Sequence, residues 1–168
     1  FLAGAVRYRL ANQDTGELLS VLPECGGVVQ HLALRQGNSL HSVLDGVTEE
    51  DMPGNIWRKS SLLFPFPGRI KDGTYTFGGR TYQLPINEPL RNTALHGLVT
   101  DAPFAVSRAE NTQEAVSLEL THEYDGHLAG YPFPFVLRVT YTLTCESRFW
   151  LYVQAQNIGT EAMPMGFG

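Results

Sequence analysis

Apolar and polar residues alternate along much of the chain, most clearly toward its C-terminal end. Between residues 135 and 144, apolar side chains occupy every second position and mostly threonines stand between them. This period of two is typical of a strand that buries one face. A second alternating run covers residues 149–155, and the short Glu146-Ser147 break predicts that the two runs pair as an antiparallel hairpin.

A second hairpin is predicted around Gly78-Gly79. The runs Thr74–Phe77 and Arg80–Leu84 flank this pair, and glycine tolerates the positive φ angles that a two-residue turn requires. Further strands are expected at residues 116–120, 6–10, 18–22 and 28–34. A short turn of helix is expected within residues 49–61. Many short strands with regular turns predict an all-β protein, an antiparallel β-sandwich.

Composition narrows the classes of function. The chain has 168 residues, 43% of them hydrophobic, which suits one globular domain. Its net charge is −5, with lysine only at Lys59 and Lys71, so we expect no nucleic-acid partner. No apolar stretch approaches the roughly 18 residues of a membrane span, so no membrane partner is expected either. We expect a cytoplasmic protein.

Metal and disulfide chemistry are not indicated. Cys25 and Cys145 stand 120 positions apart, so we expect two buried thiols and neither a zinc site nor a disulfide scaffold. His122 and His127 lie five positions apart around a predicted turn, whereas a helical zinc motif spaces its histidines by four. We expect surface histidines there and no metal.

The most informative block begins at Ser61-Leu62-Leu63-Phe64-Pro65-Phe66-Pro67-Gly68-Arg69-Ile70 and continues through the glycine hairpin. Leu84-Pro85-Ile86-Asn87 and Leu95-His96-Gly97 follow, and later come Asp125-Gly126 and Gly130-Tyr131-Pro132. In these ordered motifs the chain resembles the aldose 1-epimerase (galactose mutarotase) family from about Trp57 onward. The resemblance implies a galactose mutarotase-like supersandwich, of which residues 1–168 would be the N-terminal part, continued beyond residue 168.

The resemblance also implies a reaction, the interconversion of the α and β anomers of an aldose. Ring opening needs one acid and one base and no cofactor, because neither electrons nor a carbon group moves. The family uses a histidine as the acid and a glutamate as the base, and no residue of this chain matches either. Both are expected beyond residue 168, so the chain alone is expected to be inactive. The expected partner is a free or phosphorylated monosaccharide, together with the C-terminal segment or a homodimer partner.

Two residues match the family's sugar-binding pair, Arg69 and His96. Arginine offers a rigid fork of donors for sugar oxygens, and histidine can donate or accept near neutral pH. The alternatives are a surface arginine lying over Phe64 or Phe66 and a histidine at the end of a strand. Asn87, Phe66 and Tyr131 are further pocket candidates.

The nearby carboxylates Glu88 and Asp125 are expected to have structural roles in a loop and a turn. Gly68 departs from the family pattern, which often has asparagine before the arginine, and this leaves the identity of the sugar open. Two other functions remain open on the sequence. One is a non-catalytic sugar-binding or sugar-sensing β-sandwich, and the other is a structural module without a ligand.

Overall fold

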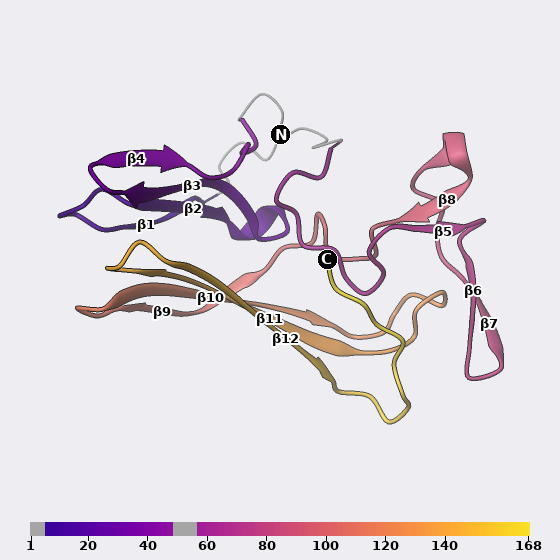
Figure 1. Ribbon diagram of the computed structural model, residues 1–168. Coiled ribbons are helices and arrows are strands. Elements are labelled where there is room, and N and C mark those ends of the chain that lie inside the picture. Colours follow the sequence, from indigo (N-terminus) through magenta and orange to yellow (C-terminus); the bar gives the residue numbers. More distant parts are fainter. Residues whose placement is uncertain (1–5, 49–56) are drawn as a thin grey trace.

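The computed structural model describes residues 6–48 and 57–168, which form two four-stranded antiparallel sheets and two small two-stranded ribbons (Figure 1). The first sheet has the order β1-β2-β3-β4, and the second has the order β12-β11-β10-β9. The two sheets lie face to face, and the ribbons β5–β8 and β6–β7 lie together at one end (Figure 1). The all-β antiparallel sandwich predicted from the sequence is confirmed.

The first sheet is built from the N-terminal part of the chain. Its strands are β1 (Tyr8–Ala11), β2 (Leu18–Leu22), β3 (Val28–Gln36) and β4 (Ser39–Ser42). A 3-10 helix, η1 (Pro23–Cys25), connects β2 to β3. The predictions at residues 6–10, 18–22 and 28–34 correspond to the first three strands, whereas β4, whose four residues are all exposed, was not predicted.

The second sheet contains the longest strands. They are β9 (Ala105–Asn111), β10 (Ala115–Tyr124), β11 (Phe135–Thr144) and β12 (Phe149–Asn157). The predicted hairpin of β11 and β12 is confirmed, with Phe135 opposite Asn157 and Leu143 opposite Phe149. Strand β9 was not predicted, because nearly all of its residues are exposed and its sequence carries little apolar alternation.

The core lies between the two sheets. The apolar face of β11, predicted from its alternation, is almost completely buried. It meets apolar residues of the first sheet such as Leu19, Val21 and Leu32 in one cluster. The hydroxyl of Tyr141, a buried residue of β11, donates a hydrogen bond of 2.6 Å to the carbonyl oxygen of Gly27. The two layers are therefore joined by packing and by a buried hydrogen bond.

Strand β12 is less buried than the strand it pairs with. Its partner β11 is buried, but Trp150, Leu151 and Tyr152 remain 60%, 44% and 64% exposed. Within residues 6–48 and 57–168, β12 is the outer strand of its sheet and pairs only with β11. Met165 and Phe167, near residue 168, are also exposed.

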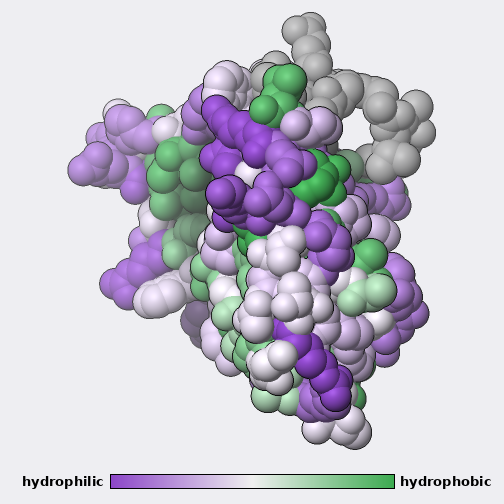
Figure 2. Space-filling model, turned by 90° about the vertical axis from the view of Figure 1, so that its right-hand side faces the viewer, coloured by the Kyte–Doolittle hydropathy of each residue, from purple (hydrophilic) through white to green (hydrophobic). Residues whose placement is uncertain are grey.

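The ribbon end of the molecule carries Arg69 and His96. Strands β6 (Thr74–Phe77) and β7 (Arg80–Gln83) form the predicted glycine hairpin, with φ of 58° at Gly78 and 77° at Gly79. The other ribbon pairs β5 (Arg69–Lys71) with β8 (Thr93–Leu95), and a 3-10 helix, η2 (Pro89–Arg91), precedes β8. Hydrophilic residues gather on the upper part of this face (Figure 2).

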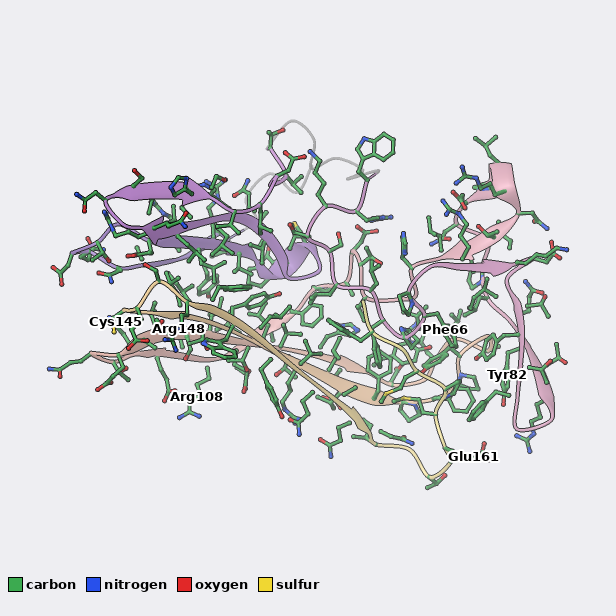
Figure 3. All side chains as sticks on the ribbon, viewed as in Figure 1. Phe66, Tyr82, Arg108, Cys145, Arg148 and Glu161 are labelled. Carbon is green, nitrogen blue, oxygen red and sulfur yellow. The ribbon has the colours of Figure 1, made fainter. Side chains whose placement is uncertain are left out.

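One expectation falls mostly outside the described residues, and one needs correction. The helical turn expected within residues 49–61 lies mostly outside the described residues, and residues 57–61 form turns without a helix. The cysteines are both free, as expected, but Cys145 is exposed and Cys25 is only partly buried. Cys145 lies in the β11–β12 turn, at the end of the sandwich opposite Phe66 (Figure 3).

Candidate functional site

The site begins with an ion pair between Arg69 and Glu88. Arg69 is the first residue of β5, and its side chain extends into solvent with 46% of its surface exposed. Its Nε donates to Oε2 of Glu88 at 2.6 Å, and its Nη2 donates to Oε1 at 2.8 Å. This is the parallel two-bond geometry in which arginine binds carboxylates best.

Glu88 is held from more than one side. Thr93 Oγ1 donates to its Oε2 at 2.6 Å, and Arg91 Nη1 donates to its Oε1 at 2.9 Å. The hydrogen bonds from Arg69 and Thr93 lower the pKa of Glu88 from 4.5 to about 2. The carboxylate is therefore ionised at neutral pH and stays paired with Arg69.

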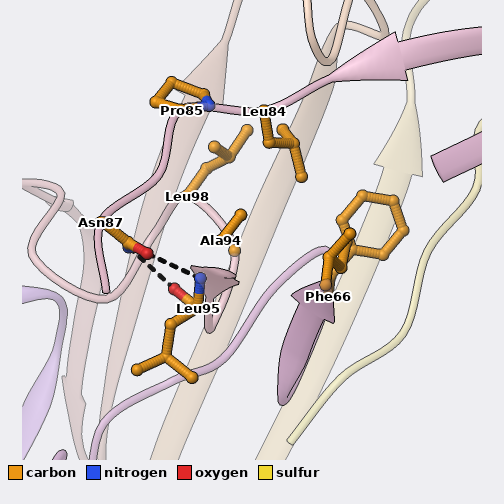
Figure 4. Close-up of a pocket in the computed structure, with 9 residues that line it drawn as sticks. Phe66, Leu84, Pro85, Asn87, Ala94, Leu95 and Leu98 are labelled. Carbon is orange, nitrogen blue, oxygen red and sulfur yellow. Dashed lines mark hydrogen bonds between the residues drawn. The ribbon is translucent and has the colours of Figure 1, made fainter. Parts of the chain in front are cut away.

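Asn87 fixes strand β8 beside this ion pair. Its amide nitrogen donates to the carbonyl oxygen of Leu95 at 2.9 Å, and its amide oxygen accepts from the Leu95 N–H at 2.6 Å (Figure 4). The side-chain amide thus pairs with β8 as a peptide group of a neighbouring strand would. The sequence suggested Asn87 as a pocket residue, and the structure shows both ends of its amide bound to Leu95.

His96 follows β8 directly and has an unusual backbone conformation. Its φ is 64°, and Gly97 continues with a φ of 76°. The His96 N–H donates to the Gly68 carbonyl at 2.9 Å, and the Gly68 N–H donates to Nδ1 of His96 at 3.2 Å. Gly68 itself has a φ of 91°, which glycine adopts readily. These two bonds fix both the backbone and the ring of His96.

The surroundings of His96 favour its neutral form. Burial lowers the pKa of its imidazole below 6.5, and the positive charges of Arg58 and Arg69 lower it further. Because Nδ1 accepts a hydrogen bond, the neutral ring carries its proton on Nε2. His96 therefore offers one N–H donor, and Arg69, which follows Gly68 in the chain, lies close enough for its charge to lower the His96 pKa. The structure brings these two predicted residues together at the end of one ribbon.

A cavity of about 230 Å³ lies beside the β5–β8 ribbon, and residues of both strands help to line it (Figure 4). Most of its lining is apolar and comes from residues such as Phe66, Ile70, Leu84 and Leu98. Ile70 follows Arg69 in β5, so its side chain points to the opposite face of the ribbon. Neither Arg69 nor His96 lines this cavity.

The aromatic pocket candidates lie on this apolar side. Phe66 lines the cavity and contacts Tyr131 edge to face, with 5.6 Å between ring centroids. Tyr131 is completely buried, and its hydroxyl donates to the Pro164 carbonyl oxygen at 2.7 Å. In this structure Tyr131 is a core residue and does not face the groups of Arg69 and His96.

Glu88 is the residue of the site that the sequence reasoning undervalued. Its position in a loop before proline predicted a structural role. In the structure Glu88 lies directly before η2, which begins at Pro89. No local sequence pattern indicates its pairing with Arg69, because the two residues are 19 positions apart. Asp125, the other carboxylate, accepts from the ring and the backbone N–H of His127 in an exposed turn.

Comparison with solved structures defines the class of fold. A galactose mutarotase-like protein from Clostridium acetobutylicum has a TM-score of 0.75 at 24% identity, over 94% of this chain and 47% of that chain. Galactose 1-epimerase from Lactobacillus acidophilus has a TM-score of 0.66 at 22% identity, over 90% of this chain and 44% of that chain. The fold is a galactose mutarotase-like β-sandwich.

Sequence comparison defines the family. Residues 7–168 match the family model of aldose 1-epimerase, and the chain belongs to that family. The uncharacterized protein YihR of Escherichia coli K12 is 35% identical over 119 residues, which cover 71% of this chain and 36% of that protein. The chain spans about half the length of the solved structures. Among the described residues, no helix is long and apolar enough to cross a membrane.

Proposed function

We propose that the protein is an aldose 1-epimerase, an isomerase that interconverts the α and β anomers of a monosaccharide. The observation that supports this most directly is the pair of donors at one end of the β5–β8 ribbon, Arg69 and His96. Both occupy the positions that resemble the family's sugar-binding pair. Family membership and the galactose mutarotase-like fold support the same reaction class.

The reaction requires two proton transfers. An acid protonates the ring oxygen while a base removes the proton of the anomeric hydroxyl, and the C1–O5 bond breaks to give the open-chain aldehyde. Rotation about the C1–C2 bond and reversal of both transfers then give the other anomer. No atom or electron is gained or lost, so no cofactor is required by the chemistry.

Within this scheme the described residues bind and orient the sugar. Arg69 donates to sugar oxygens, and Nε2–H of neutral His96 donates to a neighbouring oxygen. The acid and the base are proposed to come from the part of the family fold that lies outside these 168 residues. Free hexoses, pentoses and phosphorylated aldoses remain the candidate substrates.

Polarimetry tests the assignment of the two binding residues. In the polypeptide encoded by the full reading frame, Arg69→Ala should reduce the rate at which freshly dissolved α-glucose or α-galactose approaches equilibrium, whichever sugar the wild type accepts. Arg80→Ala is the matched control, because Arg80 is 72% exposed on the β6–β7 hairpin. An Arg69→Ala variant with the wild-type rate would remove Arg69 from the site.

A further inference from the structure

The ion pair with Glu88 occupies one edge of the Arg69 guanidinium. A guanidinium carries five N–H groups, and Glu88 takes one from Nε and one from Nη2. The remaining edge, between Nη1 and Nη2, has two parallel N–H groups. Within residues 6–48 and 57–168, no hydrogen bond to that edge is present.

Glu88 is itself fixed by neighbours that do not touch the free edge of Arg69. Thr93, a buried residue of β8, holds Oε2, and Arg91 of η2 holds Oε1. The backbone of Glu88 also pairs with Thr93, because the Glu88 N–H donates to the Thr93 carbonyl at 3.1 Å. The carboxylate is thus anchored to the same strand that carries His96 at its end.

This anchoring matters because Arg69 is a long side chain with nearly half of its surface exposed. Without a partner, such a side chain samples many rotamers, and a ligand would have to order it on binding. With its Nε edge bound to an anchored carboxylate, the guanidinium has one orientation, and the edge that remains can bind two oxygens at once.

We infer that Glu88 is a positioning residue, which orients Arg69 so that its Nη1–Nη2 edge binds two adjacent oxygens of the sugar. The inference rests on the proposed function, since it concerns the same site. The ligand class it implies is a sugar with neighbouring oxygen atoms, recognised by a planar pair of donors and not by charge. Glu88 itself does not contact the sugar.

The test is a double-mutant cycle on the polypeptide of the full reading frame, with the initial rate of anomer interconversion followed by polarimetry. Glu88→Gln should raise KM by about tenfold, the loss expected for one well-placed hydrogen bond, and change kcat less than twofold. In an Arg69→Ala background, Glu88→Gln should have no further effect on KM. Arg80→Ala, an exposed position on the β6–β7 hairpin outside these contacts, is the control and should change KM less than twofold.

Each outcome decides a different point. A wild-type protein that does not accelerate the interconversion would contradict the proposed function and the inference that rests on it. An active wild type with unchanged KM in Glu88→Gln would contradict the inference alone, as would an equal loss in both backgrounds, which indicates a purely structural role. If Glu88→Gln does not fold, Thr93→Val replaces it, with a smaller rise in KM that must vanish in the Arg69→Ala background.

Discussion

Gly68 and His96 hold each other through two hydrogen bonds in opposite directions: the His96 N–H donates to the Gly68 carbonyl, and the Gly68 N–H donates to the His96 ring. The second bond requires a lone pair on Nδ1, which only the neutral imidazole provides. It follows that the ring has its proton on Nε2 and that protonation of His96 must break this bond.

His96 should therefore be neutral at pH 7, with its proton on Nε2. Nitrogen-15 NMR of the histidine rings should show this tautomer, with a titration midpoint below 6.5, because burial and the nearby arginines lower the pKa. A His96 ring with its proton on Nδ1 would contradict the account.

The same shift predicts a pH dependence of stability. Because the pKa of His96 is lower in the folded chain than its ordinary value of 6.5, the unfolded chain binds the proton more tightly. As the pH falls below about 6.5, the free energy of unfolding of the wild type should decrease relative to that of His96→Asn. Urea unfolding at pH 7.5 and pH 5.5 measures this difference, which would be equal at both pH values if His96 were unperturbed.

The ionised Glu88 predicts a further loss of stability in acid, at a lower pH than the loss that involves His96. Its pKa falls from 4.5 to about 2 on folding, so its ionised form stabilises the folded chain above pH 4.5. This contribution should be lost as the pH falls from 4.5 toward 2. Wild type and Glu88→Gln should differ in unfolding free energy at pH 6 and converge near pH 2. A difference that does not change with pH would show that the carboxylate is not stabilised by its partners.

Glu17 is a buried carboxylate at the other end of the sandwich. It is fully buried and accepts hydrogen bonds from Thr15 and from Ser147, which lies in the turn between β11 and β12. Glu17 therefore connects the first sheet to the second. Burial raises its pKa, but the hydroxyl donors and Arg35 outweigh this, and the pKa is lowered overall.

Replacing Glu17 should destabilise the sandwich. Glu17→Gln places an amide N–H₂ against hydroxyl donors and should cost about 1–3 kcal/mol of unfolding free energy. Chemical denaturation gives this value, and Glu114→Gln at an exposed position serves as the control. A cost below 0.5 kcal/mol, roughly that of an ordinary surface substitution, would show that the connection between the sheets contributes little.

Replacing Gly97 should lower the unfolding free energy more than replacing Glu17. A Cβ atom at this position would lie 2.3 Å from the carbonyl oxygen of Phe64, and the φ of 76° disfavours any other residue. Gly97→Ala should cost about 1–2 kcal/mol for the backbone conformation and a further 1–3 kcal/mol for the clash. Gly37→Ala, with a φ of 59° and nothing within 4 Å, should show only the first cost. Equal losses in the two variants would contradict the close contact.

The sequence was most informative where buried and exposed side chains alternate with the two-residue period of a strand. The strands β10 and β11 alternate between core and surface, and this alternation is directly visible in the chain. The short strands β5 and β8 were not predicted, because they carry three residues each and are held by the Asn87 side chain and by the pairing of Arg69 with Glu88. Bonds between residues so far apart in sequence leave no local pattern.

In the candidate site too, the sequence indicated some of the residues but not the interactions that orient them. Resemblance to a family pointed to Arg69 and His96, but the tautomer of His96 depends on the backbone of Gly68, and the orientation of Arg69 depends on Glu88. Phe66 was a pocket candidate, and it lines a cavity beside the ribbon. Tyr131 was named on the same grounds, yet it is completely buried in the core cluster.

The most direct test of the central claim is the optical rotation of freshly dissolved α-glucose and α-galactose, followed with the polypeptide encoded by the full reading frame. We predict a catalytic acceleration toward the equilibrium rotation of at least one of these sugars, and a loss of most of it in the Arg69→Ala and His96→Ala variants. Sugar binding without any acceleration by the folded wild-type protein would contradict the assignment as an aldose 1-epimerase.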